Sequence, residues 1–262
     1  PADLYYAASG LIAGRVSDDG IPFNAQPEYK WKVLSGNAQF ANTRAQRPTI
    51  EFGDNQPNLI SLESSDGQIT TFAQAKVQSF YERRTIVGRG ANSRWLIPED
   101  DDLGLGWIDP AFDDTSWNSG PGGFGYDQKG EYSLFLDSGT NIEGAMRGRS
   151  SSAYVRIPFA LPQLTYVQGL KLLINYNDGF VVYVNGVEVA RKNAPDGELS
   201  WQSVANSTRR PEAAQIAREI DLMLEGVLLK AGQNVIAIHG MNTDIEDDDF
   251  LLNPVIEAEL IA

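Results

Sequence analysis

Carboxylates are the side chains of this sequence that could do chemistry, and they gather in three clusters. The clusters are Glu99–Asp102, Asp113-Asp114 and Glu246–Asp249. None of them has the ligand spacing of an EF-hand, and loops of this length do not build the deep cleft in which paired carboxylates hydrolyse glycosides. Loop carboxylates and backbone carbonyls can supply the oxygen ligands of calcium. The clusters therefore indicate either a calcium site or a solvated acidic face.

The chain has one histidine, His239, which ends the apolar run NVIAIHG, and it has no cysteine. A single histidine cannot form a multi-histidine metal site, and the lack of cysteine also argues against a zinc enzyme. A Ser-His-Asp triad would require an activated serine beside His239, yet the sequence contains no Gly-x-Ser-x-Gly elbow. We therefore expect His239 to be a hydrogen-bonded structural residue, and we expect no enzyme activity.

Aromatic residues in loops are the best candidates for contacting a ligand. Exposed rings stack on the C–H faces of sugars, and a few placed polar groups beside them fix the orientation. Such rings occur here in segments rich in Gly, Ser and Asp. The loop that leads to Trp201 also contains polar side chains. The alternative is that the rings only cover the core. The predicted sugar site comprises Trp107, Tyr126, Arg191, Asn193 and Trp201.

Arg156 lies in the middle of the apolar run AYVRIPF. A buried arginine needs carboxylate partners, and the sequence offers Asp178, Glu188 and Asp249 as candidates. We favour an internal salt-bridge network over a role for Arg156 in ligand binding.

The elements that position these residues are predicted to be β-strands. Short alternating runs recur at intervals of about ten residues with turn residues between them, which is typical of β-sandwiches. In the stretch Tyr176–Gly197, the dipeptide Asn185-Gly186 predicts a type I′ hairpin turn. The residues before it are apolar on both faces of the strand, so we expect a central strand that is covered on both sides. Only Pro211–Gly226 mixes helical and strand patterns.

The charge is unevenly distributed over the 262 residues. Residues 1–84 carry 8 basic and 9 acidic side chains, whereas residues 85–262 carry 13 and 26, for a total of −14. Such an acidic surface repels phosphate backbones and anionic lipids, which disfavours nucleic acid and membrane surfaces as partners. No apolar run approaches the ~20 residues of a membrane span. The N-terminus resembles no signal peptide and lacks a starting Met, so we expect the chain to be a piece of a larger multidomain chain. We also expect it to be monomeric.

Four motifs characterise the first part of the chain: LIAGRVSDDG (11–20), YKWKVLSG (29–36), PTIEF (48–52) and LISLESSDGQITTFAQAKV (59–77). Together they resemble the PKD-type immunoglobulin-like domains of bacterial surface proteins and secreted enzymes. Trp31 alternates with lysines, so its ring is expected to point into the core. The turns Asp18-Asp19-Gly20 and Asp66-Gly67 are expected to be capped by their carboxylates. The resemblance implies a spacer or adhesion module.

Five motifs characterise the second part: SRWLIPEDDD, GWIDPAFDDTSWNSGPGGFGYD, SSAYVRIPF, the hairpin at 176–197, and the closing runs NVIAIHGMN and DDDFLLNPVIEAEL. Together they resemble the galactose-binding-like jelly-roll module of secreted planctomycete-type proteins. The resemblance implies that Trp95 and Trp117 pack in the core. It also implies a structural Ca²⁺ near the chain ends, for which Asp113, Asp114 and Glu257 are the expected ligands.

The predicted fold class is therefore all-β, with an immunoglobulin-like (PKD-type) β-sandwich over residues 1–84 and a galactose-binding-like jelly-roll β-sandwich over residues 85–262. The favoured function is that of a non-catalytic accessory region of a secreted or cell-surface bacterial protein, which binds carbohydrate or polysaccharide through the jelly roll. The alternative is a structural spacer or adhesin segment that has no sugar site and is stiffened by calcium.

Overall fold

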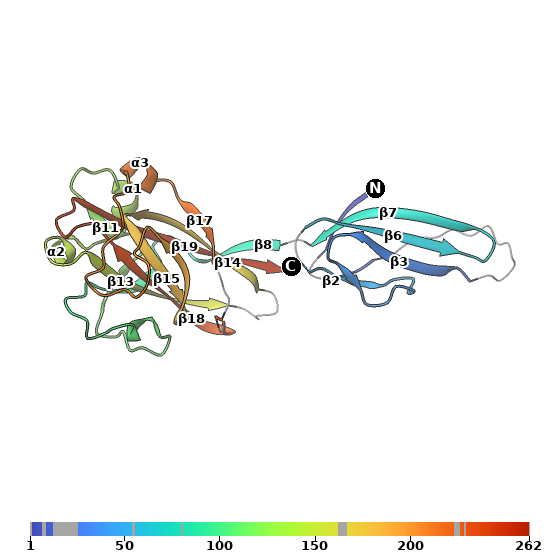
Figure 1. Ribbon diagram of the computed structural model, residues 1–262, viewed down its shortest axis with the longest axis horizontal. Coiled ribbons are helices and arrows are strands. Elements are labelled where there is room, and N and C mark those ends of the chain that lie inside the picture. The colour runs from blue at the N-terminus through green and yellow to red at the C-terminus, as the bar shows by residue number, and fades with distance from the viewer. Residues whose placement is uncertain are drawn as a thin grey trace. The chain divides into compact units, whose positions relative to one another are not determined.

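The computed structural model describes residues 2–6, 9–12, 26–53, 56–79, 81–161, 167–222, 226–227 and 229–261. The chain forms two compact units, Pro1–Glu82 with Leu260–Ala262 and Arg83–Glu259. Strands arranged in sheets dominate each unit (Figure 1), so the predicted all-β sandwich class is confirmed. No helix in these ranges is long and apolar enough to cross a membrane.

The first unit contains two sheets. Its described strands are β1 (Ala2–Tyr6), β2 (Ser9–Leu11), β3 (Glu28–Ser35), β4 (Gln39–Phe40), β5 (Thr49–Glu51), β6 (Asn58–Ser65) and β7 (Thr70–Ser79). One sheet has the strand order β1-β7-β6-β3 and the other has the order β2-β5-β4. β1 pairs with β7 in parallel, and the other pairs are antiparallel.

The core of the first unit forms around Trp31. Its ring is buried, whereas the neighbouring Lys30 and Lys32 are exposed, so the predicted alternation is confirmed. Trp31 packs against Phe40 at 5.6 Å between ring centroids, and its indole N–H donates to the carbonyl of Ala45.

The predicted capping of the Asp66-Gly67 turn is confirmed. The Asp66 carboxylate accepts the backbone N–H groups of Gln68 at 2.8 Å and Ile69 at 2.7 Å. Gly67 has φ +94°, which a residue with a Cβ rarely adopts. The other acidic turn, Asp18-Asp19-Gly20, lies outside the described residues.

Two sheets also form the second unit. Sheet I has the strand order β10-β9-β13-β18-β15-β16 and is antiparallel throughout. Its strands are β9 (Asn92–Leu96), β10 (Asn118–Pro121), β13 (Ser152–Leu161), β15 (Gly179–Val184), β16 (Val187–Lys192) and β18 (Gly232–Met241).

Sheet II has the order β12-β11-β19-β14-β17, and β8 also pairs with β19. Its strands are β8 (Tyr81–Val87), β11 (Phe124–Asp127), β12 (Thr140–Asn141), β14 (Val167–Asn177), β17 (Arg218–Asp221) and β19 (Asp249–Ile261). The short helices are η1 (Gly106–Ile108), α1 (Ser133–Leu136), α2 (Glu143–Met146) and α3 (Pro211–Ala214). The mixed pattern at 211–226 therefore corresponds to α3 followed by β17.

The β15–β16 hairpin lies inside the second unit as predicted. All six residues of β15 are buried, and the turn residues Asn185 and Gly186 have φ +48° and +88°, as a type I′ turn requires. At its other end β15 begins one residue after β14, although β14 belongs to sheet II. The chain therefore passes from one sheet to the other at Asp178.

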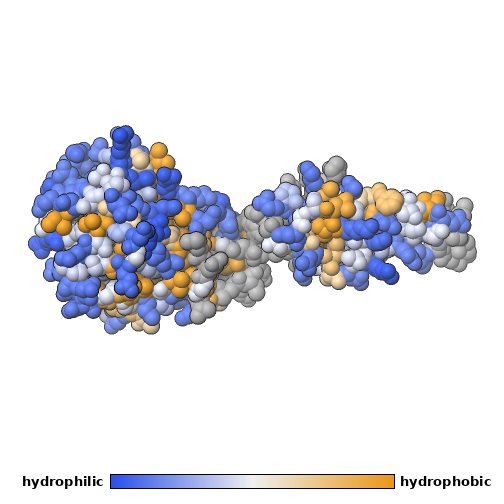
Figure 2. Space-filling model, viewed as in Figure 1, coloured by the Kyte–Doolittle hydropathy of each residue, from blue (hydrophilic) through white to orange (hydrophobic). Residues whose placement is uncertain are grey.

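The outer face of sheet I is covered by loops. The segment that contains Trp107, Ile108 and Trp117 packs on Tyr154, Val181 and Tyr183, together with Ala194 and Ala205 from the loop after β16. A sheet with apolar residues on both faces needs a cover on each side. Here these loops, which we call the loop cover, shield the face of sheet I that sheet II does not. Outside this cover, Figure 2 shows hydrophilic residues over most of the visible surface of the second unit.

Candidate functional site

Trp107 forms the centre of the loop cover and is not exposed. Its ring stacks on Tyr154 with 4.2 Å between centroids and 8° between planes, and only 1% of the residue is accessible. Tyr126 of β11 is equally buried. Its hydroxyl accepts the amide of Asn242 at 2.9 Å and donates to the carbonyl of Asp247 at 3.2 Å, and burial raises its pKa. The prediction that these two rings are exposed is wrong, so neither offers a face to a sugar.

Arg191 and Asn193 hold the loop after β16 in place. Arg191 forms an ion pair with Glu188 at 2.7 Å and donates to the carbonyls of Pro195 and Gly197. Asn193 has φ +52° and donates to the carbonyl of Asp178 at 3.0 Å. Trp201, the fifth residue of the predicted sugar site, is partly exposed.

The structure does not bring Asp113, Asp114 and Glu257 together. Asp113 accepts the backbone N–H and the hydroxyl of Thr115 at 3.0 and 2.7 Å, which lowers its pKa. Asp114 binds an arginine on sheet I, whereas Glu257 lies in β19 of sheet II. Within the described ranges, no group of three or more His, Asp or Glu side chains is arranged to hold a metal ion.

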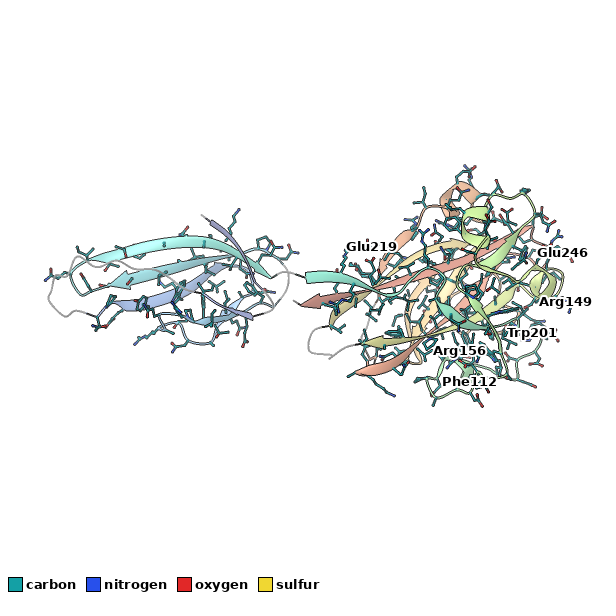
Figure 3. The ribbon with its side chains drawn as sticks, turned by 180° about the vertical axis from the view of Figure 1, so that it is seen from behind. Phe112, Arg149, Arg156, Trp201, Glu219 and Glu246 are labelled. Atoms are coloured by element: carbon teal, nitrogen blue, oxygen red, sulfur yellow. The ribbon has the colours of Figure 1, made fainter. Side chains whose placement is uncertain are left out.

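The buried arginine on sheet I is Arg156, and its network confirms the predicted internal salt bridge with a different partner. Its Nε donates to Asp114 Oδ2 at 2.7 Å, and its Nη atoms donate to the carbonyls of Trp107, Asp109 and Phe112. The candidate partners Asp178, Glu188 and Asp249 are therefore wrong. The guanidinium also lies 5.3 Å from the centroid of the Phe112 ring; both residues are labelled in Figure 3.

Arg156 forms one wall of a pocket of about 750 Å³, which we call the Arg156 pocket. Its polar lining is largely engaged in the contacts just described. Asn234 is likewise bonded to Asn185 and to both backbone groups of Lys230. The side chains of Lys230 and Gln233, which also line this pocket, have no partner among the described residues.

A second pocket, of about 530 Å³, lies beside the first part of the loop cover. We call it the Trp95 pocket, and the residues that define it are Trp95, Glu99, Asp100, Asp102, Trp117 and Arg149. Trp117 is buried as predicted, but Trp95 is partly exposed and lines the pocket, so its predicted core position is wrong. Trp95 lies opposite Val155 of β13, so its side chain is on the face of sheet I turned away from Tyr154 and the loop cover.

Most charged side chains of the Trp95 pocket have no partner within the described part of the chain, whereas the Asp100 carboxylate accepts the backbone N–H of Asp102 at 3.1 Å. The side chains of Glu99, Asp102 and Arg149 have no hydrogen-bond or ion-pair partner among the described residues, and Trp95 Nε1 has none either. In Figure 3, Arg149 lies apart from the labelled pair Phe112 and Arg156. Sequence reasoning missed this pocket because Trp95 and Arg149 are 54 residues apart and lie on unconnected elements.

His239 is structural, as predicted. It is almost fully buried, its Nε2 lies 2.7 Å from the hydroxyl of Ser152, and its ring packs edge-on against Tyr154 and Trp107. Burial, with a contribution from Arg191, lowers its pKa to about 3. Ser152 is also fully buried and contacts the carbonyl of Ser203 at 3.1 Å. This Ser-His pair is therefore closed off from substrate.

No family model matches the chain, and no curated protein sequence matches it. Among solved structures, a β-glucuronidase from Bacteroides uniformis is similar at 13% identity and a TM-score of 0.41, over 68% of this chain and 18% of the enzyme. A β-glucuronidase from Ruminococcus gnavus is similar at 12% identity and a TM-score of 0.39, over 69% of this chain and 28% of the enzyme. The chain thus spans less than a third of either enzyme, and similarity at this level does not indicate a shared function.

Proposed function

We propose that this chain is a non-catalytic accessory region of a secreted or cell-surface bacterial protein and that its second unit binds a carbohydrate in the Trp95 pocket. The observation that carries the proposal is the set of unpaired polar side chains beside a partly exposed indole ring. Ligand sites usually combine an apolar or aromatic wall with a few placed polar groups. The Trp95 pocket has this combination, whereas in the Arg156 pocket Arg156, Asp114 and Asn234 are already bonded within the protein.

The chemistry of the pocket suits a sugar. The indole ring of Trp95 offers an apolar, polarisable surface to the C–H face of a pyranose. The carboxylates of Glu99 and Asp102 can accept hydrogen bonds from hydroxyl groups, and the guanidinium of Arg149 can donate to ring or hydroxyl oxygens. Three carboxylates stand against one cation in the lining. The pocket therefore favours neutral or amino sugars and disfavours uronic acids.

The architecture supports assigning the second unit to the galactose-binding-like jelly rolls and the first to the PKD-type domains. Two sheets pack in the second unit, sheet I antiparallel throughout and sheet II antiparallel except for the β11–β12 pair, and the β15–β16 hairpin contains the turn that the motif predicts. In the first unit the two-sheet arrangement with β1 parallel to β7 suits an immunoglobulin-like sandwich. Both kinds of module commonly accompany catalytic or adhesive domains elsewhere in a chain.

The absence of catalysis is part of the proposal, and the Ser152–His239 pair supports it. The imidazole lies next to a serine hydroxyl, which is the contact a hydrolase requires. Both groups, however, are buried beneath the loop cover, and the lowered pKa of His239 makes it a poor base near neutral pH.

The experiment is affinity electrophoresis of the whole chain in gels that contain a dissolved neutral polysaccharide: galactan, xylan or mixed-linkage β-glucan. We expect at least one of them to retard the wild-type protein. Asp102→Ala should weaken that binding at least about tenfold, which corresponds to one charged hydrogen bond. Asp101→Ala is the matched control, because Asp101 is an exposed neighbour that does not line the pocket.

Two outcomes would contradict the proposal. If Asp102→Ala and Asp101→Ala bind equally well, the sugar does not occupy the Trp95 pocket. If none of the polysaccharides, and no glycan on an array, retains the wild-type protein, the alternative of a spacer or adhesin segment without a sugar site takes its place.

A further inference from the structure

Four hydrogen-bonding side chains lie in a row in the second unit where the polypeptide passes between its sheets. Asp178 lies at the crossing from β14 to β15 and is almost completely buried. The Thr243 hydroxyl, in the loop between β18 and β19, lies 3.3 Å from Asp178 Oδ2 and 3.0 Å from Asp247 Oδ2. The Asp247 side chain is in turn in hydrogen-bond contact with that of Asp249, the first residue of β19. We call these four side chains the Asp178–Asp249 network.

The network has too few protons when its three carboxyls are ionised. A carboxylate only accepts hydrogen bonds, and a hydroxyl has one proton to donate. Thr243 can therefore donate to Asp247 or to Asp178 but not to both, and two ionised carboxylates offer no donor to the contact between Asp247 and Asp249. A proton on Asp178 would complete the first contact, because Asp178 would then donate to Thr243. A proton on Asp249 would complete the second, because Asp249 would then donate to Asp247.

Negative and neutral groups face the network from the neighbouring elements. Asp127 of β11 lies directly opposite Asp249 in the antiparallel β11–β19 pair, where like charges repel. The Tyr132 hydroxyl, from the residue before α1, bonds the Asp249 carboxyl. The Tyr126 hydroxyl of β11 donates to the Asp247 carbonyl. These neighbours supply hydrogen bonds and one further negative charge, but no positive charge.

The cations of the surrounding segments are engaged elsewhere. Arg209 donates its backbone N–H to Asp178 at 2.5 Å, but its guanidinium bonds backbone carbonyls. Arg147 and Lys129 pair with Asp248 at 3.0 and 3.8 Å. The aspartates of the network form no ion pair with any described residue. Since a buried carboxylate without a cation is costly, the way in which the network can lower this cost is to take up protons.

We propose that the Asp178–Asp249 network is a pH-sensitive latch, which takes up protons as the pH falls below neutral and then fastens the loop between β18 and β19 to the sheet crossing and to the start of β19. In the protonated form, hydrogen bonds run without a gap from Asp178 to Thr243 to Asp247, and from Asp249 to Asp247. One negative charge remains, on Asp247, and it has two donors. In the ionised form three negative charges repel one another, and the loop is held less tightly.

The titration of two of the carboxyls agrees with this geometry. Burial raises the pKa of Asp178 to about 6, and the charges of Asp247 and Asp249 add to the effect. Burial also raises the pKa of Asp249 to about 6, with contributions from Asp247 and Asp127. Both values exceed the ~3.9 of an unfolded aspartate, so the folded chain binds protons in this range that the unfolded chain does not. The resulting stabilisation is complete below about pH 3.9 and is lost as the pH rises through about 6.

The latch acts where the chain changes sheets twice. At Asp178 the chain passes from β14 of sheet II to β15 of sheet I, and the loop that carries Thr243 and Asp247 leads from β18 of sheet I to β19 of sheet II. Fastening these two crossings to each other should hold the sheets together at this end of the second unit. Acidification from pH 7 to pH 5 should therefore slow the opening of this end.

The test is urea denaturation of the whole chain at pH 7, 6 and 5, for the wild type and for Asp249→Asn. Asparagine is neutral at every pH, and its amide can donate to Asp247 as a protonated Asp249 would. Relative to this variant, the unfolding equilibrium constant of the wild-type second unit should fall about tenfold from pH 7 to pH 5, because the variant lacks one carboxyl that takes up its proton only in the folded chain. Asp244→Asn is the matched control. It changes an exposed aspartate of the same loop, which caps the N–H of Glu246, and it should keep the wild-type pH dependence.

A second measurement follows the ¹³C signals of the aspartate carboxyls by NMR between pH 4 and pH 8. The wild type should show two carboxyls with midpoints near pH 6, and Asp178→Asn should show one. The proposal is overturned if every aspartate carboxyl titrates below pH 5, or if the wild type and Asp249→Asn have parallel pH profiles of stability. Should Asp249→Asn fail to fold, the NMR titration of the wild type decides by itself.

Discussion

The two pockets of the second unit, of about 750 and 530 Å³, differ in how far their charged side chains are bonded within the protein. In the Arg156 pocket, arginine, carboxylate and backbone carbonyls bond one another. In the Trp95 pocket, the side chains of Glu99, Asp102 and Arg149 have no partner among the described residues. The comparison shows that a charged residue facing a pocket is not by itself evidence of ligand binding. What distinguishes a binding site is whether the protein has already satisfied its hydrogen bonds.

The largest effect should come from the pocket whose groups are satisfied internally. Arg156→Met leaves Asp114 and three carbonyls without their donor in a buried setting, so we expect the free energy of unfolding to fall by about 3 kcal/mol. Urea denaturation of the second unit measures it. Arg94→Met is the matched control, because Arg94 is partly exposed and lies 4.0 Å from Asp114. Its loss should amount to less than about 1 kcal/mol. Equal losses would show that the two arginines are equivalent surface charges.

An intermediate effect should come from beneath the loop cover, where the Trp107 ring packs edge-on against His239. The pKa of His239 is lowered to about 3 in the folded chain, whereas the unfolded value is about 6.5. Between these values the unfolded chain binds a proton that the folded chain does not, so stability is full above pH 6.5 and falls as pH decreases. Relative to His239→Gln, the wild type should lose up to about 1.4 kcal/mol per pH unit between pH 6 and 4.

The measurement is urea denaturation of both proteins at pH 7, 6, 5 and 4. Carboxylate titration is common to both and cancels in the difference. Parallel pH profiles for the wild type and His239→Gln would show that His239 is accessible to protons in the folded chain, and the loop cover would then be looser than the structure indicates.

The smallest effect on stability should come from the open pocket. Trp95→Phe removes an N–H that has no partner, so the free energy of unfolding should change by less than about 0.5 kcal/mol. Polysaccharide retardation should weaken, because the smaller ring offers less surface for stacking. A large loss of stability would mean that Trp95 belongs to the core after all and would remove the distinction between the two pockets.

The sequence predicted the features that depend on neighbouring residues. The Asn185-Gly186 turn, the inward position of Trp31 and the double burial of β15 follow from local conformational preference and from the period-two alternation of strands. The strand content of both units follows from the same patterns.

Features that depend on distant segments were not predictable. Trp107 lies in a loop whose composition suggests exposure, but that loop folds over a sheet face. Arg156 binds Asp114, which precedes it by 42 residues and belongs to a loop whose path the sequence does not specify. The proximity of Asp178, Asp247 and Asp249 likewise depends on where the chain crosses between the sheets.

The burial of β15 has a consequence for hydrogen exchange. Its six residues are covered on both faces, and the strand is paired to β16 on one side and β18 on the other. Amide protons in such a position exchange with solvent deuterium only when the surrounding structure opens as a whole. Their exchange rate therefore reports the free energy of unfolding of the second unit. It can be measured in the intact chain, independently of the first unit.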